Sequence, residues 1–383
     1  MARLRFALFR MDIPAFSALL TGLSTLAVTG CTPDANALTD SSENALAEAS
    51  FAQTGTNLSG AQLFKKETFG GNGRTCDTCH RMPTGTISLK DVQARFSKDP
   101  GDPLFRPLDS DDGTGASYER LLTHATFLIP LPLPANVKLA DDPTATEVIL
   151  ERGTPTVRDT AALDPVLMWD GRAPNLEEQA LGATRTHAEP KRDPTAAELA
   201  QIAAFEKTLF SSAELEAYAK GGPAPGLPEG TTASEKRGRA FFEPTGLCGQ
   251  CHSGVLLNEV PSIGNVFGHP AGTRFANVRV SDPAFNPRKR PGRQWLITLP
   301  DGSTIQRSSS DPGRFLITGN PADFDNFKIS SLRNIKNTAP YFHDNSAKTL
   351  EDMVAHYGRI FAAANVPFSK QDGADVVAFL KLL

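Results

Sequence analysis

Cysteine is scarce in this chain. Its 383 residues contain five, which excludes the disulfide-dense scaffolds of small secreted domains. Four of the five stand in two copies of one short pattern and the fifth is Cys31, so no pair remains for a disulfide. The fold must therefore be stabilised by its apolar core and by whatever these cysteines bind.

Excess charge of one sign is also missing. The formal net charge is −4 and hydrophobic residues make up 40% of the chain, so the composition permits real cores and indicates no nucleic-acid partner. Positive charge gathers locally in the run Arg288-Lys289-Arg290 with Arg293, between prolines. We interpret this run as a solvated loop rather than a docking patch.

The N-terminus has the layout of a secretory signal. Arginines precede an apolar run from Ile13 to Val28 that is short for a membrane span. The run ends in Val-Thr-Gly-Cys31, which resembles a bacterial lipoprotein box. We expect residues 1–30 to be a lipoprotein signal peptide and residues 31–57 a flexible tether. A plain cleaved signal is the alternative; both lead to the periplasm, the first with a lipid anchor on the membrane surface.

A C-x-x-C-H pattern occurs twice, as Cys76-Asp77-Thr78-Cys79-His80 and as Cys248-Gly249-Gln250-Cys251-His252. Two thiols three positions apart can each bond one vinyl group of a porphyrin, and the adjacent histidine then binds the iron. Redox C-x-x-C pairs and zinc knuckles are the alternative, but neither needs the histidine twice. The sequence therefore predicts two covalently bound haem c groups, held by Cys76, Cys79, His80, Cys248, Cys251 and His252.

A helix-forming stretch and a glycine turn precede each motif, over residues 59–69 and again over 234–242. This internal repeat predicts two cytochrome c-like domains, each with one haem c. The Gly/Pro-rich segment 221–228 is the clearest linker. We expect a mainly α fold with long loops and a small β-hairpin, divided into an N-terminal domain (58–222) and a C-terminal domain (230–383).

Several elements can be predicted individually. A capping box at Thr195 starts a helix over 195–219, and another at Ser369 starts a terminal helix that should pack on the helix before the haem motif. Apolar periodicity predicts a helix over 349–361. Pro300-Asp301-Gly302 lies between two β-prone runs and predicts the hairpin, whereas most of 83–190 reads as loop.

Two further stretches carry a resemblance to a known family. They are WDGRAPNLEEQA at 169–180, and FKISSLRN at 327–334 followed by TAPYFHD at 338–344. Both resemble signatures of the bacterial di-haem cytochrome c peroxidases and their MauG-like relatives. With the two haem motifs in the same order, the resemblance covers about residues 58–383.

The resemblance implies roles for single residues. In that family the N-terminal haem is peroxidatic and the C-terminal haem relays electrons. Trp169 would lie between the haems as an electron bridge, Gln179 would lie in the distal pocket of the first haem, and Glu189 would be its acid–base carboxylate. One carboxylate beside an open coordination site can accept a proton from one peroxide oxygen and return it to the other.

A calcium ion between the domains is also implied, held by the carbonyls of Thr338 and Pro340. The family's asparagine ligand is not evident, because Gly153-Thr154-Pro155 stands there. Calcium is therefore left open.

The sixth ligands of the irons decide the chemistry. Tyr357 stands where the peroxidases have a methionine and MauG has its tyrosine ligand, so we predict Tyr357 as ligand of the C-terminal haem iron. Met353 one turn away and a plain core tyrosine are the alternatives, and we read His356 as a surface residue. His124 is the best candidate for a releasable ligand on the first iron, with a packed histidine as the alternative. His187 could line the same pocket as Glu189.

The leading hypothesis is a peroxidase-type oxidoreductase that reduces hydrogen peroxide at the N-terminal haem with electrons relayed through the C-terminal haem. Its donor would be a small c-type cytochrome or a cupredoxin. The alternatives are a MauG-like enzyme that oxidises residues of a partner protein, a non-catalytic di-haem electron carrier and, more weakly, a di-haem oxygenase. A homodimer would be expected by analogy with the family alone.

Overall fold

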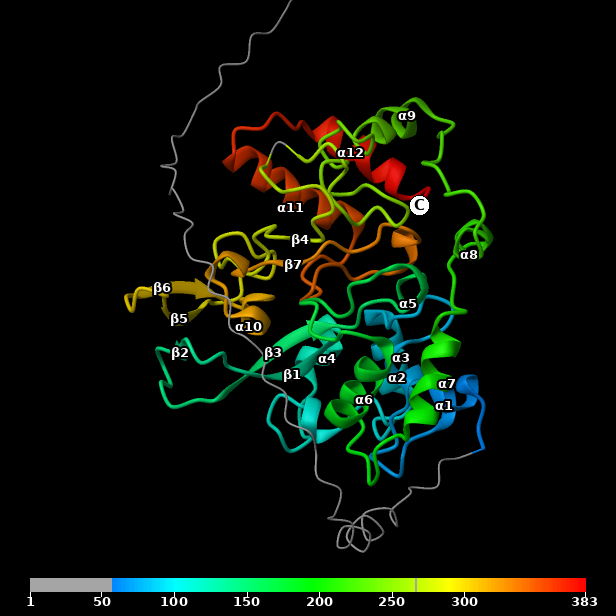
Figure 1. Cartoon of the computed structure of the whole chain (residues 1–383), viewed down its shortest axis with the longest axis vertical. Coiled ribbons are helices and arrows are strands. Elements are labelled where there is room, and N and C mark those ends of the chain that lie inside the picture. The colour runs from blue at the N-terminus through cyan, green and yellow to red at the C-terminus, as the bar shows by residue number, and fades with distance from the viewer. Residues whose placement is uncertain (1–56, 266) are drawn as a thin grey trace, which may run out of the picture. The chain divides into compact units, whose positions relative to one another are not determined.

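The computed structural model describes residues 57–265 and 267–383 (Figure 1). The expected signal peptide, the lipoprotein cysteine Cys31 and all of the expected tether except Asn57 lie outside the described residues. Within those residues, no helix is long and apolar enough to cross a bilayer.

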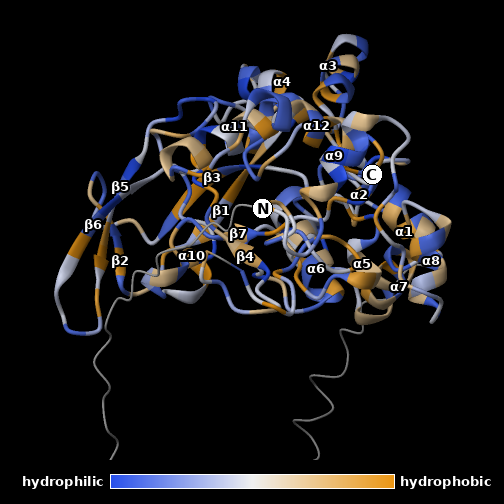
Figure 2. Ribbon diagram, turned by 90° about the horizontal axis from the view of Figure 1, so that it is seen from above, coloured by the Kyte–Doolittle hydropathy of each residue, from blue (hydrophilic) through white to orange (hydrophobic). Residues whose placement is uncertain are grey.

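The described part of the chain is mainly helical, with small sheets. Its α-helices are α1 (Gly60–Lys66), α2 (Cys76–Cys79), α3 (Leu89–Lys98), α4 (Glu119–His124), α5 (Thr160–Leu163), α6 (Leu176–His187), α7 (Ala196–Glu206), α8 (Ala213–Ala219), α9 (Ala233–Ala240), α10 (Phe315–Thr318), α11 (Leu350–Ala363) and α12 (Lys370–Leu380). The 3-10 helices are η2 (Pro107–Asp109), η3 (Pro321–Asp323) and η4 (Ile335–Asn337). Blue and orange alternate along many helices in Figure 2, as expected of amphipathic helices that cover a core.

The strands form three small antiparallel sheets. They are β1 (Thr126–Pro132), β2 (Val137–Leu139), β3 (Glu147–Gly153), β4 (Phe275–Ala276), β5 (Arg293–Thr298), β6 (Thr304–Ser309) and β7 (Phe327–Lys328). β1 pairs with β3, β4 pairs with β7, and the third sheet has the order β2-β5-β6. The predicted hairpin is confirmed as β5–β6, with Trp295 opposite Arg307. The stretch read as loop contains α3, α4 and the β1–β3 pair, so it is more ordered than expected.

The two capping boxes predicted from the sequence located their helix starts correctly. The boxes at Thr195 and Ser369 are present and begin α7 and α12. The single helix expected over 195–219 is wrong, because α7 ends at Glu206 and α8 begins only at Ala213. Ser212 explains the break: its side chain caps α8 by accepting the backbone N–H of Leu215, which favours a new helix start over continuation.

The helix before each haem motif crosses a later helix closely. α1 packs on α7, and α9 packs on α12 as expected for the terminal helix. At the first crossing Gly60 faces the carbonyl of Gln201, and at the second Gly238 faces the carbonyl of Asp375; a Cβ on either glycine would lie 2.0 Å from that oxygen. The same close approach at both crossings is the structural form of the sequence repeat.

The hydrophobic core does not divide cleanly at the predicted linker. One cluster joins residues 87–150 to Trp295, Ile297 and Phe315, and β2 pairs with β5 across the boundary. A second cluster is built from residues 242–257 and 332–383. The segment 293–324 therefore packs with the N-terminal part of the chain, while the two-domain division of the haem motifs stays a prediction.

Candidate functional site

Each C-x-x-C-H histidine is held by one hydrogen bond in the same way. The Nδ1 atom of His80 lies 3.0 Å from the carbonyl oxygen of Gly85, and Nδ1 of His252 lies 2.7 Å from that of Leu257. A backbone carbonyl can only accept, so Nδ1 carries the proton and the Nε2 lone pair is free to bind a metal. Burial lowers the pKa of both histidines, which favours the neutral form that a ligand needs.

The four thiols of the two motifs form no disulfide, and burial keeps them neutral by raising the pKa of each. Burial raises the pKa of Cys76 to about 12 and that of Cys79 to about 11, and it also raises that of Cys248 to about 12. Redox-active or metal-binding cysteines need the opposite shift. Among residues 57–265 and 267–383, no group of three or more His, Cys, Asp or Glu side chains could hold a metal ion. The arrangement fits covalent haem c better than zinc.

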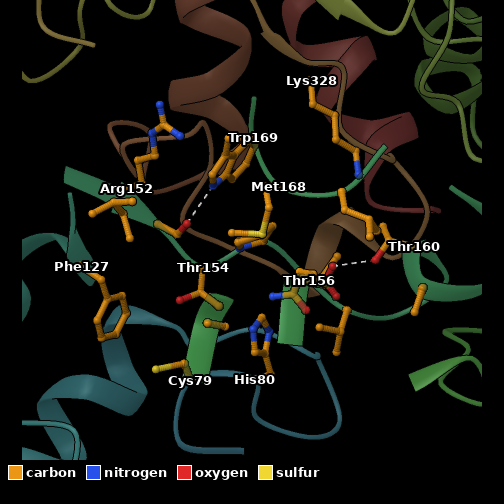
Figure 3. Close-up of a pocket in the computed structure, with 18 of the residues that line it drawn as sticks. Cys79, His80, Phe127, Arg152, Thr154, Thr156, Thr160, Met168, Trp169 and Lys328 are labelled. Atoms are coloured by element: carbon orange, nitrogen blue, oxygen red, sulfur yellow. Dashed lines mark hydrogen bonds between the residues drawn. The ribbon is translucent and has the colours of Figure 1, made fainter. Parts of the chain in front are cut away.

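A cavity of about 880 Å³, including its mouth, opens beside Cys79 and His80. Figure 3 shows these two residues at the floor of the cavity, with Met168 and Trp169 above them. One face of α6 forms a wall and contributes Leu176, Gln179, Ala183 and His187. These positions follow the helical repeat, and the small Ala183 leaves space between the amide and the imidazole.

A second cavity of about 2030 Å³, including its mouth, is lined by Cys248, Cys251 and His252. Trp169 lines this cavity as well as the first, and so do Met168, Thr154, Pro155, Thr156, Thr160 and Lys328. The two cavities therefore share a wall. In that wall the indole Nε1 of Trp169 donates to the carbonyl of Gly153 at 2.8 Å, the contact drawn in Figure 3.

Comparison with known proteins agrees with this geometry. Residues 56–213 match the family model of the di-haem cytochrome c peroxidases. Over this span the chain is similar to that family.

Individual relatives are distant and are matched over part of their length. The chain is 29% identical over 260 residues to cytochrome c551 peroxidase of Nitrosomonas europaea, covering 60% of this chain and 64% of the relative. It is 26% identical over 273 residues to methylamine utilization protein MauG of Methylorubrum extorquens, covering 62% and 65%. A solved structure of a MauG-like protein associated with microbial copper homeostasis aligns with 21% identity and a TM-score of 0.48, over 85% of this chain and 86% of that one.

The chain thus spans less than two thirds of the length of these curated relatives. The matched family, the di-haem cytochrome c peroxidases, implies haem c cofactors.

Glu189, the carboxylate that the family resemblance singles out, does not line the first cavity. It follows α6 in a loop, at a positive φ of 47°, and its side chain is exposed. Its Oε2 accepts a hydrogen bond of 2.8 Å from Nδ2 of Asn72, in the turn before the first motif. Glu189 therefore lies in a loop, as expected, but its side chain does not line the cavity beside His80.

His187 does line the first cavity. Its Nδ1 is buried without a hydrogen-bond partner, and its ring packs edge-on against Phe127, with centroids 6.5 Å apart. Burial lowers the pKa of His187 to about 4, so the imidazole is neutral near pH 7 and each nitrogen can serve as donor or acceptor.

Glu206 is a cavity residue that the sequence reasoning missed. It is 4% exposed on α7, and its Oε2 is buried without a partner. Burial, reinforced by Glu177, raises the pKa of Glu206 to about 8. A signal was present, because Glu206 stands four residues after Ile202 on the apolar face of the predicted helix.

His124 is not in the haem cavities. It ends α4 and lines a separate pocket with Arg288 and Lys348. The structure therefore places His124 away from the first cavity, and its role as a releasable ligand of the first iron stays a prediction. The Nδ1 atom of His124 is buried and has no hydrogen-bond partner.

α11 presents both predicted ligand candidates to the second cavity. Tyr357 and Met353 line it together with Cys248 and Cys251. Burial and the nearby cysteines raise the pKa of Tyr357, so the side chain is a neutral phenol unless a cation faces it. His356 is fully buried, with Nε2 2.7 Å from the carbonyl oxygen of Val278, so its reading as a surface residue is wrong.

Thr338 and Pro340 also line the second cavity. A calcium ion bound by their carbonyls stays a prediction.

Proposed function

We propose that the chain is a di-haem c oxidoreductase that reduces hydrogen peroxide beside His80 with electrons passed on from the site at His252. The observation that carries this proposal is the wall shared by the two motif cavities, with Trp169 anchored in it. Haem c would be held by Cys76, Cys79 and His80 at the first site and by the second motif at the other, and each would supply redox-active iron chemistry.

Reduction of one peroxide to two waters consumes two electrons and two protons, so the site must move protons as well as electrons. The amide of Gln179 can orient a bound peroxide without competing for its protons. The neutral imidazole of His187 can accept a proton from one oxygen of hydrogen peroxide and donate it to the other peroxide oxygen. Glu189, exposed two residues further on, would exchange protons with solvent at the rim.

Several contacts keep Trp169 in place. Its carbonyl accepts from the backbone N–H of Lys328 at 2.8 Å, and its indole donates to Gly153. The next residue, Asp170, is fully buried and pairs with Arg152, which also binds Asp311 at 2.8 Å. A rigid indole between two redox centres would keep the electron path constant during turnover.

A second candidate function follows from Tyr357. A phenolate ligand would stabilise oxidised iron at the second site more than a thioether does. Such a site would help to share oxidising equivalents, as the MauG-like alternative requires, and the reductant would then be a residue of a partner protein.

The peroxidase proposal also includes a periplasmic location, a lipid anchor and a small c-type cytochrome or cupredoxin as electron donor.

Steady-state kinetics test the proposal most directly. Purified holoprotein is mixed with peroxide and a ferrous small c-type cytochrome, and oxidation of the cytochrome is followed optically. Turnover that falls at least tenfold in Trp169→Phe, with the same absorption spectrum at both haems, is expected. A wild-type protein that exchanges electrons but leaves peroxide unreacted would identify an electron carrier instead.

A further inference from the structure

The basic run at 288–290 is not a solvated loop, and that prediction is wrong. The side chains of Arg288 and Arg290 are only 14% and 16% exposed. Both pair with the one carboxylate of Glu151, at 3.1 and 3.2 Å. Two partly buried guanidinium groups on a single carboxylate leave positive charge that this carboxylate does not neutralise.

A pocket of about 1250 Å³, including its mouth, opens beside this pair. It contains five cations, two carboxylates and no residue of either haem cavity. One carboxylate, Asp352, already caps α11 by accepting the backbone N–H groups of Lys348 at 3.2 Å and Thr349 at 3.0 Å. Positive charge therefore dominates the pocket, although the chain as a whole is acidic.

Three residues that line this pocket each carry a polar atom that is buried without any partner. These atoms are Nδ1 of His124, Nη1 of Arg290 and Oγ of Ser346. They come from the end of α4, from the basic loop and from the segment before α11. An unpaired buried polar group is costly, so three at one pocket need an explanation.

All three atoms can donate a hydrogen bond, since the imidazole can carry its proton on Nδ1. Unpaired donors from residues of a cationic pocket match a compact anion with several acceptor oxygens. The arginine and lysine groups of the pocket would supply the positive charge, and the serine and histidine would orient the anion through hydrogen bonds. A metal cation would meet the wrong charge here.

We propose that this pocket is a binding site for a tetrahedral oxyanion of the phosphate class, with Arg290, Ser346 and His124 as its donors. The same chemistry is offered by free inorganic phosphate and by the phosphate of an anionic phospholipid headgroup. The site is independent of the haem chemistry, because it shares no lining residue with the haem cavities.

Titration calorimetry of the holoprotein with inorganic phosphate at low ionic strength tests the free-anion source. Arg290→Gln and Ser346→Ala should each weaken binding about tenfold or more, because each loses a hydrogen bond to a charged ligand. Arg293→Gln is the matched control: it removes the same charge from an exposed pair with Asp141 and should bind like wild type. Ser346→Ala tests the site even if Arg290→Gln fails to fold.

A second arm uses vesicles of phosphatidylcholine with and without phosphatidylglycerol. Co-sedimentation that requires the anionic lipid and is lost in Ser346→Ala would assign the headgroup as the source, while calorimetric binding without it would assign free phosphate. The proposal is overturned if wild type binds neither, or if both pocket variants bind like Arg293→Gln.

Discussion

Gly238→Ala should destabilise the protein although alanine is the better helix former. Gly238 stands within α9, where this helix crosses α12. A Cβ built on it lies 2.0 Å from the carbonyl oxygen of Asp375 and 2.8 Å from Cβ of Phe379. The oxygen belongs to helical backbone and cannot rotate away, so the helices themselves must separate.

The size of the effect follows from that distance. Ordinary contact begins at 3.4 Å, so α9 and α12 must move apart by about 1.4 Å. Overpacking of this kind costs up to about 3 kcal/mol, and the gain in helix propensity returns about 1 kcal/mol. The net loss is about 2 kcal/mol, which lowers the melting temperature by about 3 °C for a chain of this size.

Gly182→Ala is the matched control. Gly182 is also helical, in α6, but no atom outside its own helix lies within 4 Å of the added Cβ. It should raise the melting temperature by about 1 °C, since only helix propensity changes. Thermal unfolding of both holoproteins by far-UV circular dichroism measures the pair. If Gly238→Ala melts at or above the wild-type temperature, the close helix crossing is refuted.

Three further predictions concern the cavities. His187→Ala should slow the reaction with peroxide by about 10²-fold or more, whereas Glu189→Gln should slow it less; stopped-flow kinetics compare them, and the reverse order would restore Glu189 as the acid–base group. Tyr357→Phe should change the absorption spectrum of the oxidised second haem while Met353→Leu should not, and the opposite result would make Met353 the ligand. The pKa of Glu206 is raised to about 8 by burial, so its folded form holds a proton that the unfolded chain releases near pH 4.5; wild-type stability should therefore fall as pH rises from about 4.5 to 8. Glu206→Gln should remove this loss, as melting temperatures at pH 5 and 9 would show, and an unchanged pH dependence would contradict the assignment.

The sequence predicted those parts of the fold that depend on the spacing of residues within one short stretch of chain. A capping box spans four residues, a haem motif five, and the apolar faces of α11 and α12 a few turns, so each is complete within one stretch of chain. The turn at Pro300-Asp301-Gly302 located the β5–β6 hairpin for the same reason.

The points that the sequence left wrong or open around the pockets concern partners distant in sequence. His124 was placed by its order between two motifs, but its surroundings are set by Arg288 and Lys348, more than 160 positions away. The basic run was read as solvated because Glu151, which neutralises part of it, cannot be identified from the run itself. His356 lay off the apolar face of its helix, yet the carbonyl of Val278 gives it a buried partner.

The internal repeat also explains how two similar sites could take different roles. The histidine side of the two sites is built alike, with a glycine at the helix crossing and Nδ1 bound to the carbonyl five residues on. Other walls differ: α6 gives the first cavity Gln179 and His187 on either side of Ala183, whereas α11 gives the second cavity Tyr357 and Met353. Amide and imidazole groups beside a small residue suit a site that admits and orients a ligand, while a phenol or thioether suits one closed by its own protein. The division between a reacting haem and a relaying haem would then depend on one helix at each site.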